Sequence, residues 1–212
     1  MSVAFANTLF AVRGHVQEGL GSREKLAAWL SGHPAVLGRV AAPRVGAMVP
    51  GAAGVLASSA VSAGDLGVFV GLRDAIRGLI RAQIDDVPAD AEALAVLNRS
   101  AAVAPAWPEL VRDQDGYRVE LRGAGRPVEV ALGVLARDAM DLLARDQVAL
   151  LQACQGPGCV QFFLKDHARR HWCSPGCGNR ARVAKHYART SASPRSASAG
   201  TVPRRPGRSS TT

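Results

Sequence analysis

Residues 154–159, CQGPGC, and residues 173–177, CSPGC, hold all four cysteines of this 212-residue chain. Together they read C-x4-C-x13-C-x3-C. Two close pairs of thiolates can surround one tetrahedral Zn²⁺ at Zn–S distances of about 2.3 Å, while the residues between the pairs fold back as a short hairpin. The spacing therefore predicts one structural zinc ion, with the ligands Cys154, Cys159, Cys173 and Cys177.

Disulfide bonds are the main alternative for paired cysteines. The apolar residues 3–12 are not preceded by the basic segment of a secretory signal, so we expect a cytoplasmic protein. In a reducing compartment, paired cysteines more often bind metal than form disulfides. His167 and His171 could replace a thiolate or hold a second ion, but with four thiolates present we expect them at the surface or at a phosphate.

The residues around the cysteines predict a small fold built on the metal. Phe162, Phe163 and Trp172 are apolar enough to wrap a core that is too small to form without its ion. Ser174 is a suitable N-cap and Pro175 suits the first position of a helix. A hairpin, a ligand pair and then a helix are the order of a treble-clef-like finger.

The predicted helix is basic and carries Arg180, Arg182, Lys185 and Arg189. At about 100° per residue, Arg182, Lys185 and Arg189 share one face, whereas Arg180 lies on nearly the opposite side. Three cations on one stripe suit a row of phosphates or the floor of a groove. We predict all four as nucleic-acid-binding residues, of which Arg180 is the weakest candidate.

Positive charge is concentrated at the same end of the chain. Residues 165–212 contain eleven Lys and Arg and a single acid, Asp166, so they account for the whole net charge of +9. This asymmetry favours a polyanion such as nucleic acid as the partner, although a solvated tail would look the same. Residues 190–212 are mostly Ser, Thr, Ala, Gly, Pro and Arg, and we expect them to be disordered.

The run WCSPGCGNR at residues 172–180 resembles the signature of the CGNR zinc finger proteins, whose finger follows an N-terminal domain called ABATE. The resemblance spans about residues 3–189 and implies a stress-linked transcription regulator. For such a regulator we expect that the N-terminal domain senses a small-molecule effector or forms a homodimer. Weaker ABATE-like landmarks precede the finger in order: Ala6-Asn7-Thr8, Glu24 to Leu30, Leu72 to Ile76, Leu97-Asn98 and Asp138 to Leu143.

Residues 1–150 show the periodicities of an α+β body. Helical spacing of apolar residues predicts helices after an N-cap at Ser22, over 65–81 with Asp65 as cap, and over about 133–151. Residues 117–122 alternate apolar and charged side chains, as a half-buried strand does. With a turn at 123–125 and renewed alternation at 128–132, they predict a β-hairpin.

Two segments of the body have more than one interpretation. Residues 45–64 carry no charge, but their glycines, serines and Pro50 make a poor membrane span, so we predict a flexible insertion at about 42–64. Arg73, Arg77 and Arg81 share a helix face and could bind an anionic ligand or pair with acids on a neighbouring helix. A solvated face is the interpretation that we favour.

The sequence as a whole predicts a mainly helical N-terminal domain with a β-hairpin (the body, residues 1–150), a four-cysteine zinc finger (the finger, 151–189) and a disordered basic tail (190–212). No catalytic motif occurs, and four thiolates leave zinc no open position, so we do not expect an enzyme. The leading hypothesis is a DNA-binding transcription regulator that has no membrane association. The alternatives are an RNA-binding or ribosome-associated protein, and a protein-interaction module with structural zinc.

Overall fold

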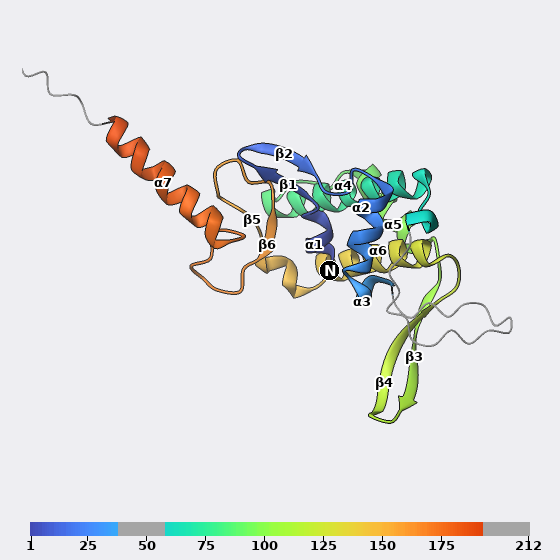
Figure 1. The fold of residues 1–212 in the computed structure, drawn as a ribbon. Coiled ribbons are helices and arrows are strands. Elements are labelled where there is room, and N and C mark those ends of the chain that lie inside the picture. Colours follow the sequence, from blue (N-terminus) through green and yellow to red (C-terminus); the bar gives the residue numbers. More distant parts are fainter. Residues whose placement is uncertain (38–57, 193–212) are drawn as a thin grey trace, which may run out of the picture.

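The computed structural model describes residues 1–37 and 58–192 and shows a helical body from which a hairpin and a long helix project (Figure 1). The predicted α+β class is confirmed. Residues 42–57 of the predicted insertion and the tail beyond residue 192 lie outside the described residues. The elements are α1 Ser2–Ala6, β1 Leu9–Val12, β2 His15–Glu18, α2 Arg23–Ser31, α3 Pro34–Leu37, the 3-10 helix η1 Ser58–Ala60, α4 Ala63–Asp85, α5 Ala91–Ala102, β3 Ala106–Asp113, β4 Gly116–Gly123, α6 Pro127–Ala144, the 3-10 helix η2 Asp146–Leu150, β5 Leu151–Ala153, β6 Phe162–Leu164 and α7 Pro175–Ala192.

The core of the body forms where α4 and α6 pack with α1, α2 and α5. Phe5 of α1 lies at its centre, with its ring centroid 5.2 Å from that of Trp29 and 6.1 Å from that of Phe69. Leu72, Ile76 and Ile80 of α4 recur at helical spacing, as predicted, and are completely buried. The same core includes Phe162, which belongs to the finger.

The start of α4 differs from the prediction by three residues. Ser62, not Asp65, is the N-cap: its hydroxyl accepts the backbone N–H of Asp65 at 3.0 Å, while the Asp65 carboxylate accepts the N–H of Ser62 at 2.8 Å. This reciprocal capping box satisfies two donors that a helix start leaves open. Val61 just before it is buried. The last residues of the predicted flexible insertion are therefore ordered by the helix that follows.

The β-hairpin is present, but its second strand was predicted in the wrong place. Residues 116–123 form β4, and their antiparallel partner is β3 before them rather than residues 128–132 after them. Residues 128–132 begin α6, where Pro127 takes the first position and Glu129 accepts the N–H of Arg126. Residues 130–136 of α6 are all buried, so the alternation of apolar residues at 128–132 did not distinguish a strand from a buried helix.

The arginines of the α4 stripe have partners within the protein, and their exposure ranges from the buried Arg73 to Arg81, whose side chain is 51% exposed. Arg73 is buried, and its guanidinium reaches Glu18 of β2 and Asp74. Burial raises the pKa of Glu18, but the hydrogen bonds from Arg73 and the Leu20 N–H, together with the charges of Arg73 and Lys25, outweigh it and leave that pKa lowered. Arg81 forms an ion pair with Asp85 at 3.6 Å. The interpretation as pairing with acids on a neighbouring helix is not met, because these acids belong to β2 and to α4 itself.

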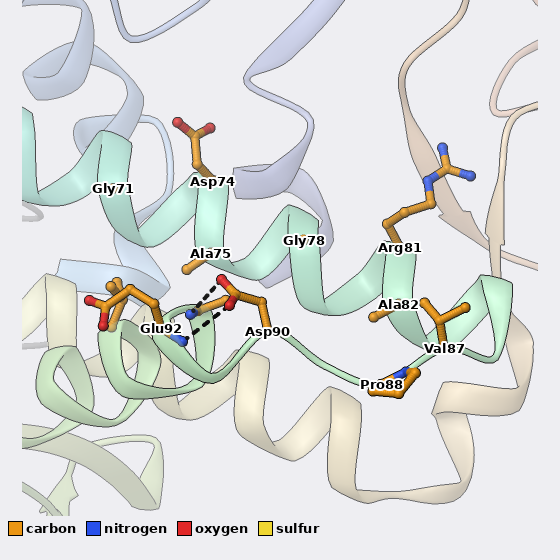
Figure 2. A pocket seen from close by; sticks show the side chains of 12 residues that line it. Gly71, Asp74, Ala75, Gly78, Arg81, Ala82, Val87, Pro88, Asp90 and Glu92 are labelled. Carbon is orange, nitrogen blue, oxygen red and sulfur yellow. Dashed lines mark hydrogen bonds between the residues drawn. The ribbon is translucent and has the colours of Figure 1, made fainter.

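An open groove of about 480 Å³ lies between α4 and α5, floored by Gly71, Ala75 and Gly78 (Figure 2). The charged side chains that line it already form hydrogen bonds or ion pairs with other residues of the chain. Asp90 accepts the N–H groups of Glu92 and Ala93, and the other pairs are Glu92 with Arg99, Asp74 with Arg73 and Arg81 with Asp85. Among the described residues, no helix combines the length and the apolar character needed to cross a membrane.

Candidate metal centre and finger helix

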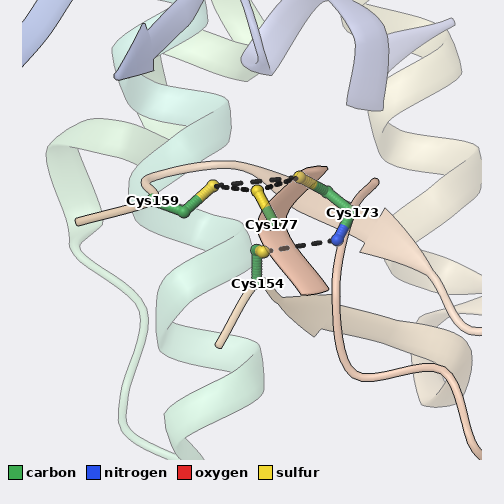
Figure 3. A group of neighbouring side chains, drawn as sticks. All are labelled: Cys154, Cys159, Cys173 and Cys177. Carbon is green, nitrogen blue, oxygen red and sulfur yellow. Dashed lines mark hydrogen bonds between the residues drawn. The ribbon is translucent and has the colours of Figure 1, made fainter. Parts of the chain in front are cut away.

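The four cysteines meet at one point although they come from three segments (Figure 3). Cys154 follows β5, Cys159 lies in the loop between β5 and β6, Cys173 precedes α7, and Cys177 lies in the first turn of α7. All four Sγ atoms lie within 4.8 Å of one another. This is the treble-clef-like order that the sequence predicts, because a hairpin supplies one ligand pair and a helix start the other.

The sulfur separations fit a single zinc ion. In a tetrahedral site with Zn–S bonds of about 2.3 Å, the sulfur atoms are about 3.8 Å apart. Here Cys159 Sγ lies 3.8 Å from the Sγ atoms of both Cys173 and Cys177, and those two atoms are 3.5 Å apart. A disulfide would need an S–S distance of about 2.0 Å, and all four cysteines are free. The centre therefore fits one structural zinc ion and not a pair of disulfides.

The surroundings of the sulfur atoms suit thiolates that hold a cation. Burial raises the pKa of the Cys159 and Cys173 thiols, and the neighbouring sulfur atoms raise it further, so four ionised thiols need a positive charge among them. Cys154 Sγ accepts the backbone N–H groups of Gly156 at 3.4 Å and Cys173 at 3.3 Å. Such bonds to ligand atoms orient them around a metal.

Each residue of the Cys-Gly-Asn-Arg tetrad at 177–180 has a structural task. Cys177 is a ligand, and Arg180 Nη2 donates to its Sγ at 2.9 Å. Gly178 faces the ring of Trp172, where a Cβ would lie 3.1 Å from Cε3, so a larger residue would displace that ring. Asn179 Oδ1 accepts from Arg182 Nη2 at 2.5 Å. The tetrad therefore secures the first turn of α7 to the zinc centre.

The contact between Arg180 and Cys177 adds a role that the sequence did not predict. Arg180 was included among the nucleic-acid-binding residues, yet its guanidinium reaches back to a zinc ligand. The sulfur of a metal-bound thiolate carries negative charge, and an arginine donor stabilises it. The contact gives Arg180 a role at the metal centre, and its contact with nucleic acid stays a prediction. All four predicted cations, Arg180, Arg182, Lys185 and Arg189, are exposed along α7.

The finger base, which we define as β5, β6 and the loop that joins them, is built into the body. Leu151 and Phe162 are each 2% exposed and belong to the main core. The side chain of Asn7 makes two hydrogen bonds to the backbone of Phe162, donating to its carbonyl and accepting its N–H, both at 2.8 Å. Residues on both sides of the boundary predicted at residue 150 thus share one core.

Arg77 fastens the same contact from α4. Its Nη1 donates to the carbonyl of Ala6 and its Nη2 to the carbonyl of Val160, both at 2.7 Å. Its guanidinium carbon also lies 4.9 Å from the centre of the Phe162 ring. Burial lowers the pKa of Arg77, which is consistent with a guanidinium enclosed between the body and the finger. One arginine thereby joins α1, α4 and the finger base.

Asn7 and Arg77 are the functional residues that sequence reasoning missed. Asn7 stood out only as part of an ABATE-like landmark, and Arg77 only as one of three spaced arginines. Neither signal points to a partner more than eighty residues away. An asparagine inside an apolar segment was the one hint, because buried amides need hydrogen-bond partners.

Comparison with known proteins gives two family matches, and the second begins at residue 151, where the finger base also begins. Residues 1–146 match the ABATE family model, described as "Putative stress-induced transcription regulator". Residues 151–190 match the CGNR zinc finger model. A search of the curated proteins found no match for the chain.

Proposed function

Because the chain belongs to the ABATE family and carries a CGNR zinc finger, we propose that it is a cytoplasmic, non-catalytic transcription regulator that binds duplex DNA through α7. Zinc is structural in this proposal. Four thiolates complete its coordination and leave no position for a substrate or an activated water. The body would then supply regulation, by a small-molecule effector or by formation of a homodimer.

The observation that carries the proposal is the charge and exposure of α7. This 18-residue helix contains no acidic residue, and it leaves the zinc centre and extends away from the body (Figure 1). Its length corresponds to about 27 Å, and a helix of ordinary diameter fits the major groove of B-DNA. Arg182, Lys185 and Arg189 are exposed on one face of it, where they can meet phosphates or base edges.

The zinc centre fixes the start of α7, as a helix that contacts DNA bases requires. Arg182 is itself held by Asn179, and its guanidinium carbon lies 6.0 Å from the centre of the Trp172 ring. A side chain whose charged group is already held in position loses less conformational entropy on binding than a free side chain does. Arg182 is therefore our first candidate for a base contact, whereas Lys185 and Arg189, farther along the helix, are candidates for phosphate contacts.

The alternatives predict different binding behaviour. An RNA-binding or ribosome-associated protein would use the same cations but prefer structured RNA, whose deep major groove does not admit a helix in the same way. A protein-interaction module would bind its partner with little dependence on salt. Duplex DNA is favoured here because a single, straight, basic helix stands clear of the body.

Fluorescence anisotropy with labelled duplex DNA tests the proposal, with DNA selected from a random pool by the zinc-loaded protein. We expect Arg182→Ala to weaken binding to the selected sequence by about 1–3 kcal/mol and to relax its specificity. Lys185→Ala should cost less, weaken binding to all sequences alike and reduce the salt dependence.

The matched control is Arg145→Ala, which removes a comparably exposed arginine, 71% exposed, from the body. It should leave DNA affinity unchanged. Stronger binding to structured RNA than to any duplex would favour the RNA alternative. Equal affinities of the Arg182, Lys185 and Arg145 variants would contradict the role of α7.

A further inference from the structure

The β3–β4 hairpin projects from the body as an arm (Figure 1). Several of its apolar side chains are exposed to solvent. Leu110 and Val119 are paired across the strands, and they are 67% and 69% exposed. Tyr117 is 69% exposed, and Trp107 at the base of the arm is 46% exposed. A two-stranded hairpin is at best marginally stable on its own in water, and an exposed apolar patch of this kind marks an interaction site.

The base of the arm is secured, so its position is fixed. Gly123 at the end of β4 packs directly on Val130 of α6, where a Cβ would lie 2.7 Å from both methyl groups of the valine. Ala104, Val130 and Val134 form a small core beside it. The arm is thus held at its base, while its outer residues, including Leu110 and Val119, are left exposed.

Only one edge of the arm can accept another strand along its whole length. Pro108 of β3 has no N–H, so its pair with Leu121 is of the kind that exchanges no hydrogen bonds within the hairpin. The backbone N–H and C=O groups of successive residues point to alternate edges of a strand. Position 108 therefore faces the outer edge of β3, where the missing N–H of Pro108 interrupts the row of hydrogen-bond donors. By the same alternation, the backbone groups of Tyr117, Val119 and Leu121 face the outer edge of β4. No proline interrupts β4.

The sequence of β4 is complementary to itself in an antiparallel pairing. Its central residues read Tyr117, Arg118, Val119, Glu120 and Leu121. If two copies pair about a two-fold axis at Val119, position 118 of each strand lies opposite position 120 of the other, and position 117 lies opposite position 121. Arginine thus meets glutamate twice and tyrosine meets leucine twice, which are favourable cross-strand pairs.

We propose that the protein forms a homodimer in which the β4 edges of two copies pair antiparallel, centred on Val119, to make one four-stranded sheet from the two arms. The occupant of the exposed edge is therefore a second copy of this chain. A two-fold interface of this kind is isologous and closed, so assembly stops at two copies. The dimer does not depend on DNA binding, but it would carry two fingers related by the same axis.

Sedimentation equilibrium of the full zinc-loaded protein, across a range of concentrations, tests the proposal. We expect a monomer–dimer equilibrium in the wild type. Val119→Lys places two lysines against each other at the axis and should raise the dissociation constant at least about tenfold. The matched control is Val16→Lys, which makes the same change at an exposed valine of the other surface hairpin, β1–β2. It should leave the equilibrium unchanged.

A charge-exchange experiment tests the register itself. Arg118→Glu puts glutamate at both facing positions, and Glu120→Arg puts arginine at both, so each variant alone should be monomeric. A mixture of the two variants restores both opposite-charge pairs and should form heterodimers, detected by energy transfer between differently labelled variants. Circular dichroism of each variant establishes that it is folded.

Two results would overturn the proposal. One is a wild type that stays monomeric at every concentration, which would mean that the edge is covered by the chain's own residues or by a different protein. The other is a dimer that Val119→Lys leaves intact, or one whose charge variants fail to complement on mixing. Either would place the interface elsewhere.

Discussion

The two halves of the finger are stabilised in opposite ways. The finger base contributes Phe162, which is 2% exposed, to the core of the body. The helix α7 has Val183 and Tyr187 exposed to 54% and 67%, and Cys177 in its first turn is its anchor at the zinc centre. One half is held by burial of apolar surface and the other by coordination of a metal.

This difference indicates what zinc does in the molecule. An isolated helix of this length is marginal in water, because most helices in proteins depend on packing. Cys154 and Cys159 come from the buried half, Cys173 and Cys177 from the exposed half, so the ion joins the two. Zinc therefore fixes the direction in which α7 leaves the body and, with it, the placement of the exposed cations.

The largest expected effect follows from removing the metal. Structural zinc contributes on the order of 10 kcal/mol to the folding of small finger domains. With a strong chelator, or with Cys177→Ser, we expect α7 to lose its helical structure and the body to keep its own. Hydrogen exchange should show α7 amides unprotected and α4 amides still protected.

The outcome for β5 and β6 distinguishes the two kinds of stabilisation. Because Leu151 and Phe162 are buried with the body, amides of both strands should stay protected without zinc. If they exchange together with α7, the finger folds as one metal-dependent unit and the comparison fails. Elemental analysis before chelation should give one zinc per chain.

The next effect comes from weakening the buried half. Phe162→Ala should lower the free energy of unfolding by about 3–5 kcal/mol, because it leaves a cavity where the finger base meets α4. Urea unfolding should show a loss of similar size with and without zinc. Tyr187→Ala, at an exposed aromatic residue of α7, is the control and should change stability by no more than about 0.5 kcal/mol.

Sequence alone could identify what depends on local spacing. The zinc ligands, the N-cap at Ser174 and the start of α7 at Pro175 are all set by residues close together in the chain, and the structure brings the four cysteines together and begins α7 at Pro175. The class of the body also followed, because helical periodicity in α4 reflects its burial against neighbours. These features require no knowledge of distant partners.

Features that depend on distant partners could not be identified. Alternation at residues 128–132 suggested a strand, but residues 130–136 of α6 are all buried, and a helical segment in that setting has no polar face to reveal its period. The stripe of arginines in α4 was interpreted as solvated because the acceptors of Arg77 are backbone carbonyls, which leave no trace in a sequence. The contact of Arg180 with Cys177 was not foreseen for a similar reason, since its partner is a thiolate.

A smaller effect tests the polar connection between the halves. Asn7→Ala leaves the N–H and the carbonyl of Phe162 without their partner, and we expect a loss of about 1–3 kcal/mol of stability. Asn7→Asp keeps the acceptor for the N–H but loses the donor to the carbonyl, so its cost should show what the second bond contributes. Wild-type stability in the Asn7→Ala variant would mean that packing of Phe162 alone holds the finger base.

The smallest effect concerns the body alone and appears as a pH dependence. Arg126 forms an ion pair with Asp65 that joins the start of α6 to the start of α4. Burial raises the pKa of Asp65, but hydrogen bonds from Arg126 and Ser62 outweigh it and lower that pKa from 3.8 to about 2. The folded protein therefore holds the carboxylate ionised more strongly than the unfolded chain does. This contribution is complete above pH 4 and is lost as the pH falls through about 2.

Asp65→Asn should accordingly cost about 1–2 kcal/mol at neutral pH, and the difference from the wild type should shrink towards zero between pH 4 and pH 2. Acid also protonates the zinc thiolates and releases the metal, but it does so in both proteins, so their difference still reports the body. Urea unfolding at several pH values measures this difference.

Asp141→Asn removes an exposed ion pair with Arg145 and is the control, with an expected cost of less than about 0.5 kcal/mol at neutral pH. If the difference for Asp65→Asn stays constant down to pH 2, the Asp65 carboxylate does not stabilise the body through its charge. Its capping bonds to Ser62 would then be its whole contribution, and the acid sensitivity of the molecule would belong to the zinc-held half.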